Sequence, residues 1–418
     1  MNFSTFRKLI LGILIMIVMT ASICLGGYWC VFFTSEFPAL RQFSDPYGFI
    51  DKTGCVVLDL RNHRRNYASG SPKEFLIEKK FSDQRCVIYG DSNSASDCTP
   101  SANYVDKAGN FLRTDSCYIF ASDFSDGRAA VVDTSYNADR LPRVGISQLP
   151  GGPAPSYRWT FIDVHGKTTA GPFCKVKAYA QGLAGVKVDG EPFWKFIDKV
   201  GRCVISGKFE QVTSFSEDRA GVLVNGKWGL IDRTGKQVLP PSYSSQIHPF
   251  HEGLAAVEVP EASRVSYLNR AGIVQFSLER HSETGSLKNV DVSEGLVVCE
   301  KDGKFGFADL SGKPIISPTF DYCWPFSEGR ALVCQKFAGK NRFGYVDRLG
   351  RLVIPCQYIE AFPFSEGFAV VTTDAHSRYY KYIDLPGGEC FGGKTFPYAQ
   401  SFHEGLAFVG SEYLRFLE

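Results

Sequence analysis

The chain has 418 residues, of which 44% are hydrophobic and 22% charged, as in a folded protein. It contains 34 Phe and 19 Tyr but only 3 Met, and this balance favours strands over helices. Arg7 and Lys8 account for the net charge of +2, and no Lys/Arg run follows. Because neutralising phosphates dominates affinity for nucleic acids, we expect no nucleic-acid partner.

The N-terminus predicts membrane attachment. Residues 1–8 are a short basic segment, and residues 9–33 then run for 25 positions without a charged side chain. A membrane span needs about 20 apolar residues, so residues 9–33 are predicted to be a transmembrane helix that serves as a signal anchor. A cleaved signal peptide is the alternative. Since the basic pair precedes the span, the positive-inside rule places residues 34–418 outside the cytoplasm.

Two short patterns alternate along the rest of the chain. The first is an aromatic residue, Ser, an acid and Gly, followed by small and branched residues. The second is aromatic, Gly, aromatic, Ile or Val, Asp, two variable residues and Gly, as in residues 228–235. The fourth position of the first pattern falls at residues 84, 127, 182, 218, 253, 295, 329, 367 and 405. We therefore expect divergent β-repeats with insertions over residues 43–178 and regular repeats over residues 179–418.

Each repeat reads as three short strands. In residues 220–239, a branched run leads to Asn225-Gly226, a strong signal for a tight hairpin turn. A second strand ends at Asp232, whose carboxylate is suited to accept backbone N–H groups in the turn that closes at Gly235. Such a small sheet cannot bury both faces alone, so neighbouring repeats must share a core.

Two all-β architectures fit these repeats. One is an open solenoid or superhelical stack of three-stranded units that follows the transmembrane helix. The other is a closed β-propeller, because the array begins and ends on second-pattern strands that would complete each other's unit. Propellers typically have four to eight blades of four strands, whereas about nine units of three strands are visible here. We therefore predict the open stack, with the propeller as the alternative.

The segment Asn225–Lys236, followed by Phe250-His-Glu-Gly-Leu-Ala, resembles the WG-repeat family of bacterial β-repeat proteins. The resemblance covers residues 43–418, although only Trp228-Gly229 keeps the literal Trp-Gly pair. It implies an exported or surface scaffold and brings no catalytic residues with it.

The recurring side chains are predicted to have structural roles. Asn269 fills the Asp position in one repeat, so an acceptor suffices there and a charge is not required. The sequence has no calcium-loop, zinc-protease or Cys-x-x-Cys pattern, and we predict no metal and no cofactor. The positions predicted to build the repeats are Trp159, Trp194, Trp228, Gly229, Asp232, Gly235, Phe305, Gly306, Asp309, Phe343, Gly344 and Asp347.

These observations predict a membrane-anchored scaffold that binds a protein partner and is not an enzyme. Near-identical units leave little unique sequence for a catalytic site outside the insertions at residues 61–80 and 133–158. The alternative is a binder of cell-wall or other glycans, in which the repeated aromatic rings stack on sugars. Exposure of the rings would separate the two, because buried rings favour the protein-binding scaffold.

Overall fold

The computed structural model describes residues 48–60, 80–91, 100–112, 118–133, 157–279, 290–373 and 379–410. The chain divides into two units, Met1–Asp45 and Pro46–Glu418, and every described residue belongs to the second. No helix in the described part is long and apolar enough to cross a membrane. The basic segment 1–8 and the span predicted over residues 9–33 lie outside the described residues.

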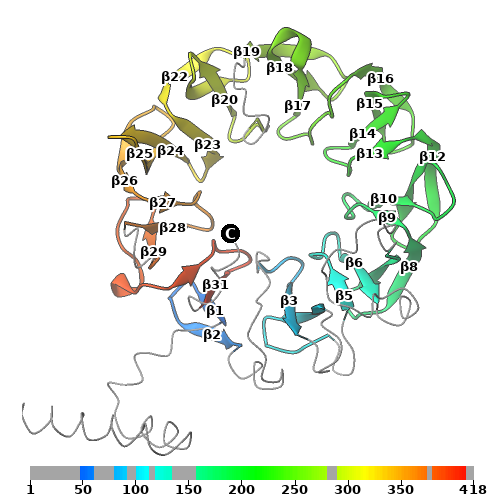
Figure 1. Ribbon diagram of the computed structural model, residues 1–418, viewed down its shortest axis with the longest axis horizontal. Helices are drawn as coiled ribbons and strands as arrows, with labels where there is room; N and C mark the ends of the chain where they lie inside the picture. Colours follow the sequence, from blue (N-terminus) through cyan, green and yellow to red (C-terminus); the bar gives the residue numbers. More distant parts are fainter. Residues whose placement is uncertain are drawn as a thin grey trace, which may run out of the picture. The chain divides into compact units, whose positions relative to one another are not determined.

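The strands form eight antiparallel sheets, described here in chain order (Figure 1). The sheet that joins the two ends of the unit contains β30 (Tyr398–Ala399), β31 (Leu406–Gly410), β1 (Gly48–Asp51) and β2 (Val56–Asp59). A six-stranded sheet follows, with β3 (Arg85–Asp91), β4 (Pro100–Asp106), β5 (Tyr118–Ala121), β6 (Arg128–Asp133), β7 (Trp159–Asp163) and β8 (Thr168–Phe173).

The other six sheets have three or four strands each. Those with four are β9 (Lys175–Val176), β10 (Leu183–Lys187), β11 (Trp194–Asp198) and β12 (Cys203–Phe209); β13 (Gln211–Val212), β14 (Arg219–Val224), β15 (Lys227–Asp232) and β16 (Gln237–Tyr243); and β23 (Tyr322–Ser327), β24 (Arg330–Phe337), β25 (Lys340–Val346) and β26 (Leu352–Tyr358). Those with three are β17 (Leu254–Val259), β18 (Arg264–Asn269) and β19 (Val274–Glu279); β20 (Leu296–Lys301), β21 (Lys304–Asp309) and β22 (Pro314–Phe320); and β27 (Glu360–Ala361), β28 (Phe368–Thr372) and β29 (Lys381–Asp384). Two 3-10 turns complete the described elements, η3 (Pro260–Ala262) and η4 (Phe391–Gly393).

The sheets are the blades of a closed β-propeller, so the predicted open stack is wrong and the alternative is right. Strand β1 pairs with β31 from Gly48↔Val409 to Asp51↔Leu406, which closes the ring with strands from both ends of the unit. The count of about nine repeats and the three strands visible in each repeat had favoured the open stack. Nine repeats fit into eight sheets because β4 and β5 pair through Ala102↔Tyr118 and join two repeats. The fourth strand of several blades, such as β9 or β13, is only two residues long and leaves little pattern in the sequence.

The core lies between neighbouring blades. In five of the repeats the aromatic residue that opens the first pattern packs edge-on against the second aromatic of the preceding repeat. Phe215 meets Phe196 with ring centroids 4.9 Å apart, and Phe326 meets Phe307 at 4.7 Å. All four rings are buried. Edge-on pairs of this kind add about 0.5–1.5 kcal/mol beyond the buried area, so each repeat depends on its neighbour for stability.

Candidate binding site

The turn that follows the second strand is held by its aspartate. The Oδ1 atom of Asp232 accepts the backbone N–H groups of Thr234 at 2.9 Å and Lys236 at 3.0 Å, and the Thr234 hydroxyl at 2.6 Å. Gly235 closes the turn at φ +85°, in the left-handed region that favours glycine. The Asp309 and Asp347 carboxylates accept backbone N–H groups at the same two turn positions.

An amide replaces the carboxylate in one repeat without loss of this geometry. The Oδ1 atom of Asn269 accepts the N–H groups of Ala271 at 2.9 Å and Ile273 at 3.0 Å. The pKa values of Asp232, Asp309 and Asp347 are held below their ordinary value. For Asp232 the largest cause is the Thr234 hydroxyl, opposed by partial desolvation and reinforced by the two backbone N–H groups. These carboxylates are thus engaged by their own turns.

The glycine of the Trp-Gly pair is required by a close crossing of backbones. A Cβ atom on Gly229 would lie 2.5 Å from the carbonyl oxygen of Leu239, and one on Gly344 would lie 2.5 Å from that of Ile354. The corresponding distance for Gly306 is 2.3 Å, to the carbonyl oxygen of Ile316. The register between the second and outer strands shifts at each of these sites, which brings the outer strand over the glycine.

Repeats without this glycine accommodate or avoid the close approach of the second and outer strands in another way. Thr160 stands opposite Gly171, and a Cβ on that glycine would come within 2.9 Å of Thr160. In the repeat that contains Ser266, the two strands pair without a shift around this position, so no close crossing arises. The glycine is therefore needed only where the outer strand bulges toward it.

The repeated aromatic residues contribute to the core between blades. Trp194 and Trp228 are buried, at 7% and 5% exposure, whereas Trp159, Phe305 and Phe343 are half-buried. Trp159 stacks on Phe120, with ring centroids 6.4 Å apart. The rings are thus not presented as a row of open faces to solvent.

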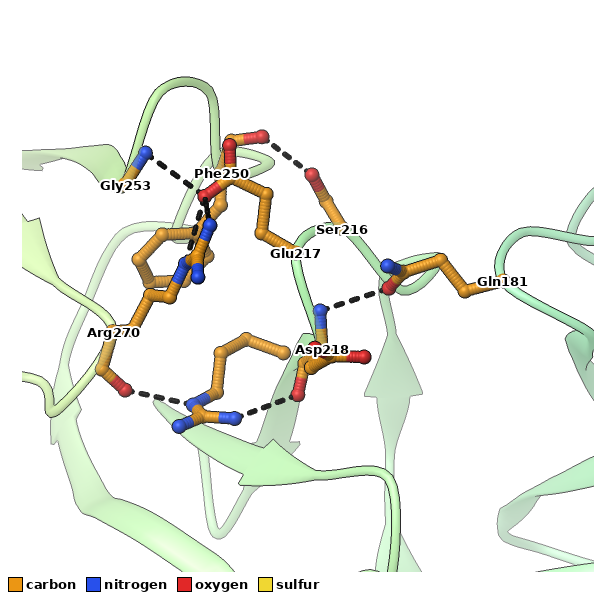
Figure 2. A network of polar contacts seen from close by, with 8 residues as sticks. Gln181, Ser216, Glu217, Asp218, Phe250, Gly253 and Arg270 are labelled. Carbon is orange, nitrogen blue, oxygen red and sulfur yellow. Dashed lines mark hydrogen bonds and ion pairs between the residues drawn. The ribbon is translucent and has the colours of Figure 1, made fainter.

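The acid of the first pattern reaches from one repeat to the next. The Glu217 carboxylate accepts the backbone N–H of Gly253 at 2.8 Å and the Arg270 guanidinium at 2.9 and 2.7 Å, as Figure 2 shows. Beside it, the Ser216 hydroxyl donates to the carbonyl oxygen of Phe250. The acid and the serine of the first pattern thus both form hydrogen bonds with the following repeat.

These contacts run around the whole ring. The side chain at the acid position of each repeat accepts a backbone N–H from the same turn of the following repeat: Asp83 from Gly127, Asp126 from Gly182, Gln181 from Asp218, Glu217 from Gly253, Glu252 from Glu294 and Gly295, Glu294 from Gly329, Glu328 from Gly367, Glu366 from Gly405, and Glu404 from Gln84. We call this set the turn belt. Its last contact joins the final repeat to the first and so closes the ring a second time.

The turn belt gives the first-pattern acids a structural role that extends beyond their own turn. Glu217 has φ +46° and the neighbouring acids have similar values, so a non-glycine residue occupies a left-handed position. Such a position costs about 1–3 kcal/mol. A hydrogen bond to a charged group contributes about 1.5–3 kcal/mol, which offsets the strain. The sequence did contain a signal for a contact at this position. An acid recurs at a turn position where Gly or Asn would be expected, which indicates that its side chain binds a partner group.

A cavity of about 630 Å³ lies where three blades meet, and sequence reasoning missed it. Its wall includes the whole of β9 with Lys175, the neighbouring Lys177, and Lys187 at the end of β10. Trp159 and Trp194 also line it. The remaining lining residues are Ser122, Ala130, Cys174, Val176, Ala178, Glu210, Gln211 and Val212. A volume of this size lies within the usual range for ligand pockets, roughly 300–1,000 Å³.

The cavity carries an excess of positive charge. Lys175 and Lys177 are exposed and Lys187 is half-buried. None of the three ammonium groups forms an ion pair or a hydrogen bond with another described residue. The one carboxylate in the wall, Glu210, accepts the backbone N–H of Gly226 at 3.2 Å. Three lysines close together without a carboxylate partner favour an anion from outside the chain. Within the described residues, no cluster of three His, Cys, Asp or Glu could hold a metal ion.

The fold and the turn belt define a closed β-propeller assembled from sequence repeats. A family model described as "WG containing repeat" matches residues 194–228, 228–259, 305–336 and 343–375. These four segments are therefore WG-containing repeats, and the resemblance of residues 225–236 to this family is confirmed.

Similarity to solved structures is distant. A dipeptidyl peptidase 4 from Porphyromonas gingivalis is 11% identical, with a TM-score of 0.47 and coverage of 80% of this chain and 60% of that one. A eukaryotic initiation factor is 12% identical, with a TM-score of 0.44 and coverage of 85% and 95%. AztD from Citrobacter koseri is 12% identical, with a TM-score of 0.35 and coverage of 74% and 95%. None of the curated proteins matches the sequence.

Proposed function

We propose that this propeller is a non-catalytic scaffold that binds a protein partner at the cell envelope. The observation that carries the proposal is the cavity beside β9, because it combines unpaired charge with apolar surface in a ring whose repeated polar groups are already engaged. The turn aspartates and the turn belt bind backbone groups, so their contribution is to rigidity. A rigid wall with a polar and an apolar part suits recognition of a folded or extended protein surface.

The burial of the aromatic rings favours a protein partner over a glycan. Sugar binding by stacking needs open ring faces, whereas Trp194 and Trp228 are buried and Trp159 is stacked on Phe120. These rings instead support neighbouring blades.

Attachment to the membrane is the second part of the proposal. The uncharged run at residues 9–33 and the preceding basic pair support a membrane-attached chain with the propeller outside the cytoplasm. Protease treatment of intact cells tests the orientation. We expect the propeller to be cleaved while a cytoplasmic marker is spared, and protection of the propeller in intact cells but not in lysed cells would contradict it.

Cross-linking in intact cells tests the binding role. The full chain is cross-linked in cells and then purified under denaturing conditions together with whatever is attached to it. We expect one and the same protein to be recovered with it in repeated experiments. The matched control is a variant in which Lys175, Lys177 and Lys187 are replaced by Glu. Recovery of glycan fragments with no protein would refute the proposal in favour of glycan binding, and recovery of neither would refute both.

A further inference from the structure

The chemistry of the cavity narrows the class of partner, on the condition that the proposed binding function holds. Lys175 begins the short strand β9, Lys177 directly follows it, and Lys187 pairs with Lys175 across β9 and β10. The three ammonium groups therefore come from adjacent backbone positions and share one cavity. Their mutual repulsion is relieved by a bound anion, and hydrogen bonds between ammonium and carboxylate groups are among the stronger ones in proteins.

The position of β9 in its sheet suits an extended chain. The strand order β12-β11-β10-β9 leaves β9 with a partner on one side only among the described strands. In Figure 1, β9 lies toward the inner side of the ring and β12 toward the outer side. An edge strand offers backbone donors and acceptors to an added strand, and side chains that alternate along that strand supply specificity.

The apolar part of the wall is the second recognition element. Trp159 and Trp194 line the cavity together with Val176 and Val212. Since Trp194 is 7% exposed and Trp159 is stacked on Phe120, the indoles offer limited open area, which suits an aliphatic side chain better than a flat sugar ring.

We infer that this cavity binds an extended acidic segment of the partner protein. Its carboxylates contact Lys175, Lys177 and Lys187, and an aliphatic side chain of the segment packs against Trp194 and Val212. Trp194 lies on the same face of the sheet as Lys187, its direct partner across β10 and β11, and Val212 belongs to the same apolar cluster as Trp194. The backbone of the segment runs beside β9.

A binding titration with a defined peptide tests the inference on the full chain in detergent. The probe is a short fluorescent peptide that alternates Glu and Thr around one central Leu, and a second peptide carries Gln for every Glu. Fluorescence anisotropy should show binding of the Glu peptide that is at least about tenfold tighter than that of the Gln peptide. Raising the salt concentration from about 50 to about 500 mM should weaken it, because salt screens exposed charges.

Variants separate the cavity from general electrostatics. The double variant Lys175→Glu with Lys177→Glu should bind the Glu peptide at least about tenfold more weakly than the native chain. The matched control, the double variant Lys236→Glu with Lys313→Glu, changes two exposed lysines outside the cavity by the same total charge and should leave the affinity within about twofold. Circular dichroism and thermal unfolding confirm that each variant is folded. Equal losses of affinity in the cavity double variant and in the control double variant would overturn the inference.

A sugar acid is the competing ligand, and an oligogalacturonate provides its test. Tighter binding of the oligogalacturonate than of the Glu peptide, with the same dependence on the lysines, would overturn the inference. The cross-linking experiment distinguishes failure of the proposed scaffold function from failure of the acidic-segment inference. If the native chain and the lysine variants capture the same protein equally, the proposed scaffold function stands and the acidic-segment inference falls. If the native chain captures no protein while the Glu peptide binds selectively, the inferred cavity chemistry stands and the scaffold function falls.

Discussion

The turn belt makes a quantitative prediction at Glu217. Replacing it with Ala removes a charged hydrogen bond to the half-buried turn of Gly253, which is typically worth about 1.5–3 kcal/mol. The ion pair with Arg270 adds less than about 1 kcal/mol, because the two side chains are 23% and 53% exposed. The left-handed backbone of residue 217 remains strained with Ala. We therefore expect Glu217→Ala to lower the free energy of unfolding by about 2 kcal/mol.

Two further substitutions at the same position divide this loss into its parts. Glu217→Gly also loses the carboxylate but relieves the left-handed strain, which is worth about 1 kcal/mol, so its loss should be near 1 kcal/mol. Glu217→Gln keeps an acceptor, as Gln181 does naturally by binding the N–H of Asp218 at 2.8 Å, and should lose less than about 1 kcal/mol. The expected order of stability is native, Gln, Gly and Ala.

Equilibrium unfolding in guanidinium chloride, followed by tryptophan fluorescence, measures the order. The control is Glu258→Ala, which changes a glutamate that makes no hydrogen bond or ion pair with another described residue. The comparison uses midpoints at a common slope. A loss below about 0.5 kcal/mol for Glu217→Ala would show that the contact contributes nothing. A Gly variant less stable than the Ala variant would refute the argument from left-handed strain.

Three other predictions follow from the repeats. Gly344→Ala forces a Cβ into a carbonyl oxygen 2.5 Å away and should cost about 3 kcal/mol in denaturant unfolding, whereas Lys195→Ala, at the same repeat position, should cost less than about 1 kcal/mol; equal costs would contradict the crossing argument. Asp232 has a lowered pKa in the folded chain, so the stability it contributes is present above its unfolded pKa of about 3.9 and lost as pH falls through the folded value. Asp232→Asn should therefore flatten the loss of stability below about pH 4, and an unchanged pH profile would refute this. Deleting residues 46–60 removes the partner of β31, so light scattering should show association or circular dichroism should show unfolding, and a folded monomer would contradict ring closure by this strand pair.

The repeat itself could be predicted because it follows local rules. The Asn225-Gly226 hairpin has φ values of +49° and +71° at its two central positions, as such a turn requires. The alternation of turns and branched runs likewise indicated the longer strands of each repeat. Local patterns of this kind determine secondary structure without knowledge of distant contacts.

Closure could not be predicted because it depends on contacts that are distant in sequence. The hydrogen bond from Gln84 to Glu404 spans 320 residues, and nothing in either segment alone identifies its partner. The first-pattern acids gave the same local signal whether they stayed in their own turn or reached the next one. The cavity was missed for a similar reason, since Ser122, Lys187 and Gln211 come together only when three blades are in place.

The cavity lies beside repeats that depart from their own pattern, and this separates the parts that hold the ring from the part suited to binding. The repeat that supplies β9 to β12 has Ala180 where other copies have Ser or His, Gln181 where they have an acid, and Lys195 where the Trp-Gly pair has glycine. The preceding copy has Thr160 at that glycine position. A symmetric ring of identical repeats would present the same surface at every blade, so a single binding site needs such departures. Selection for a partner would act on these copies, while the turn belt constrains the others to remain alike.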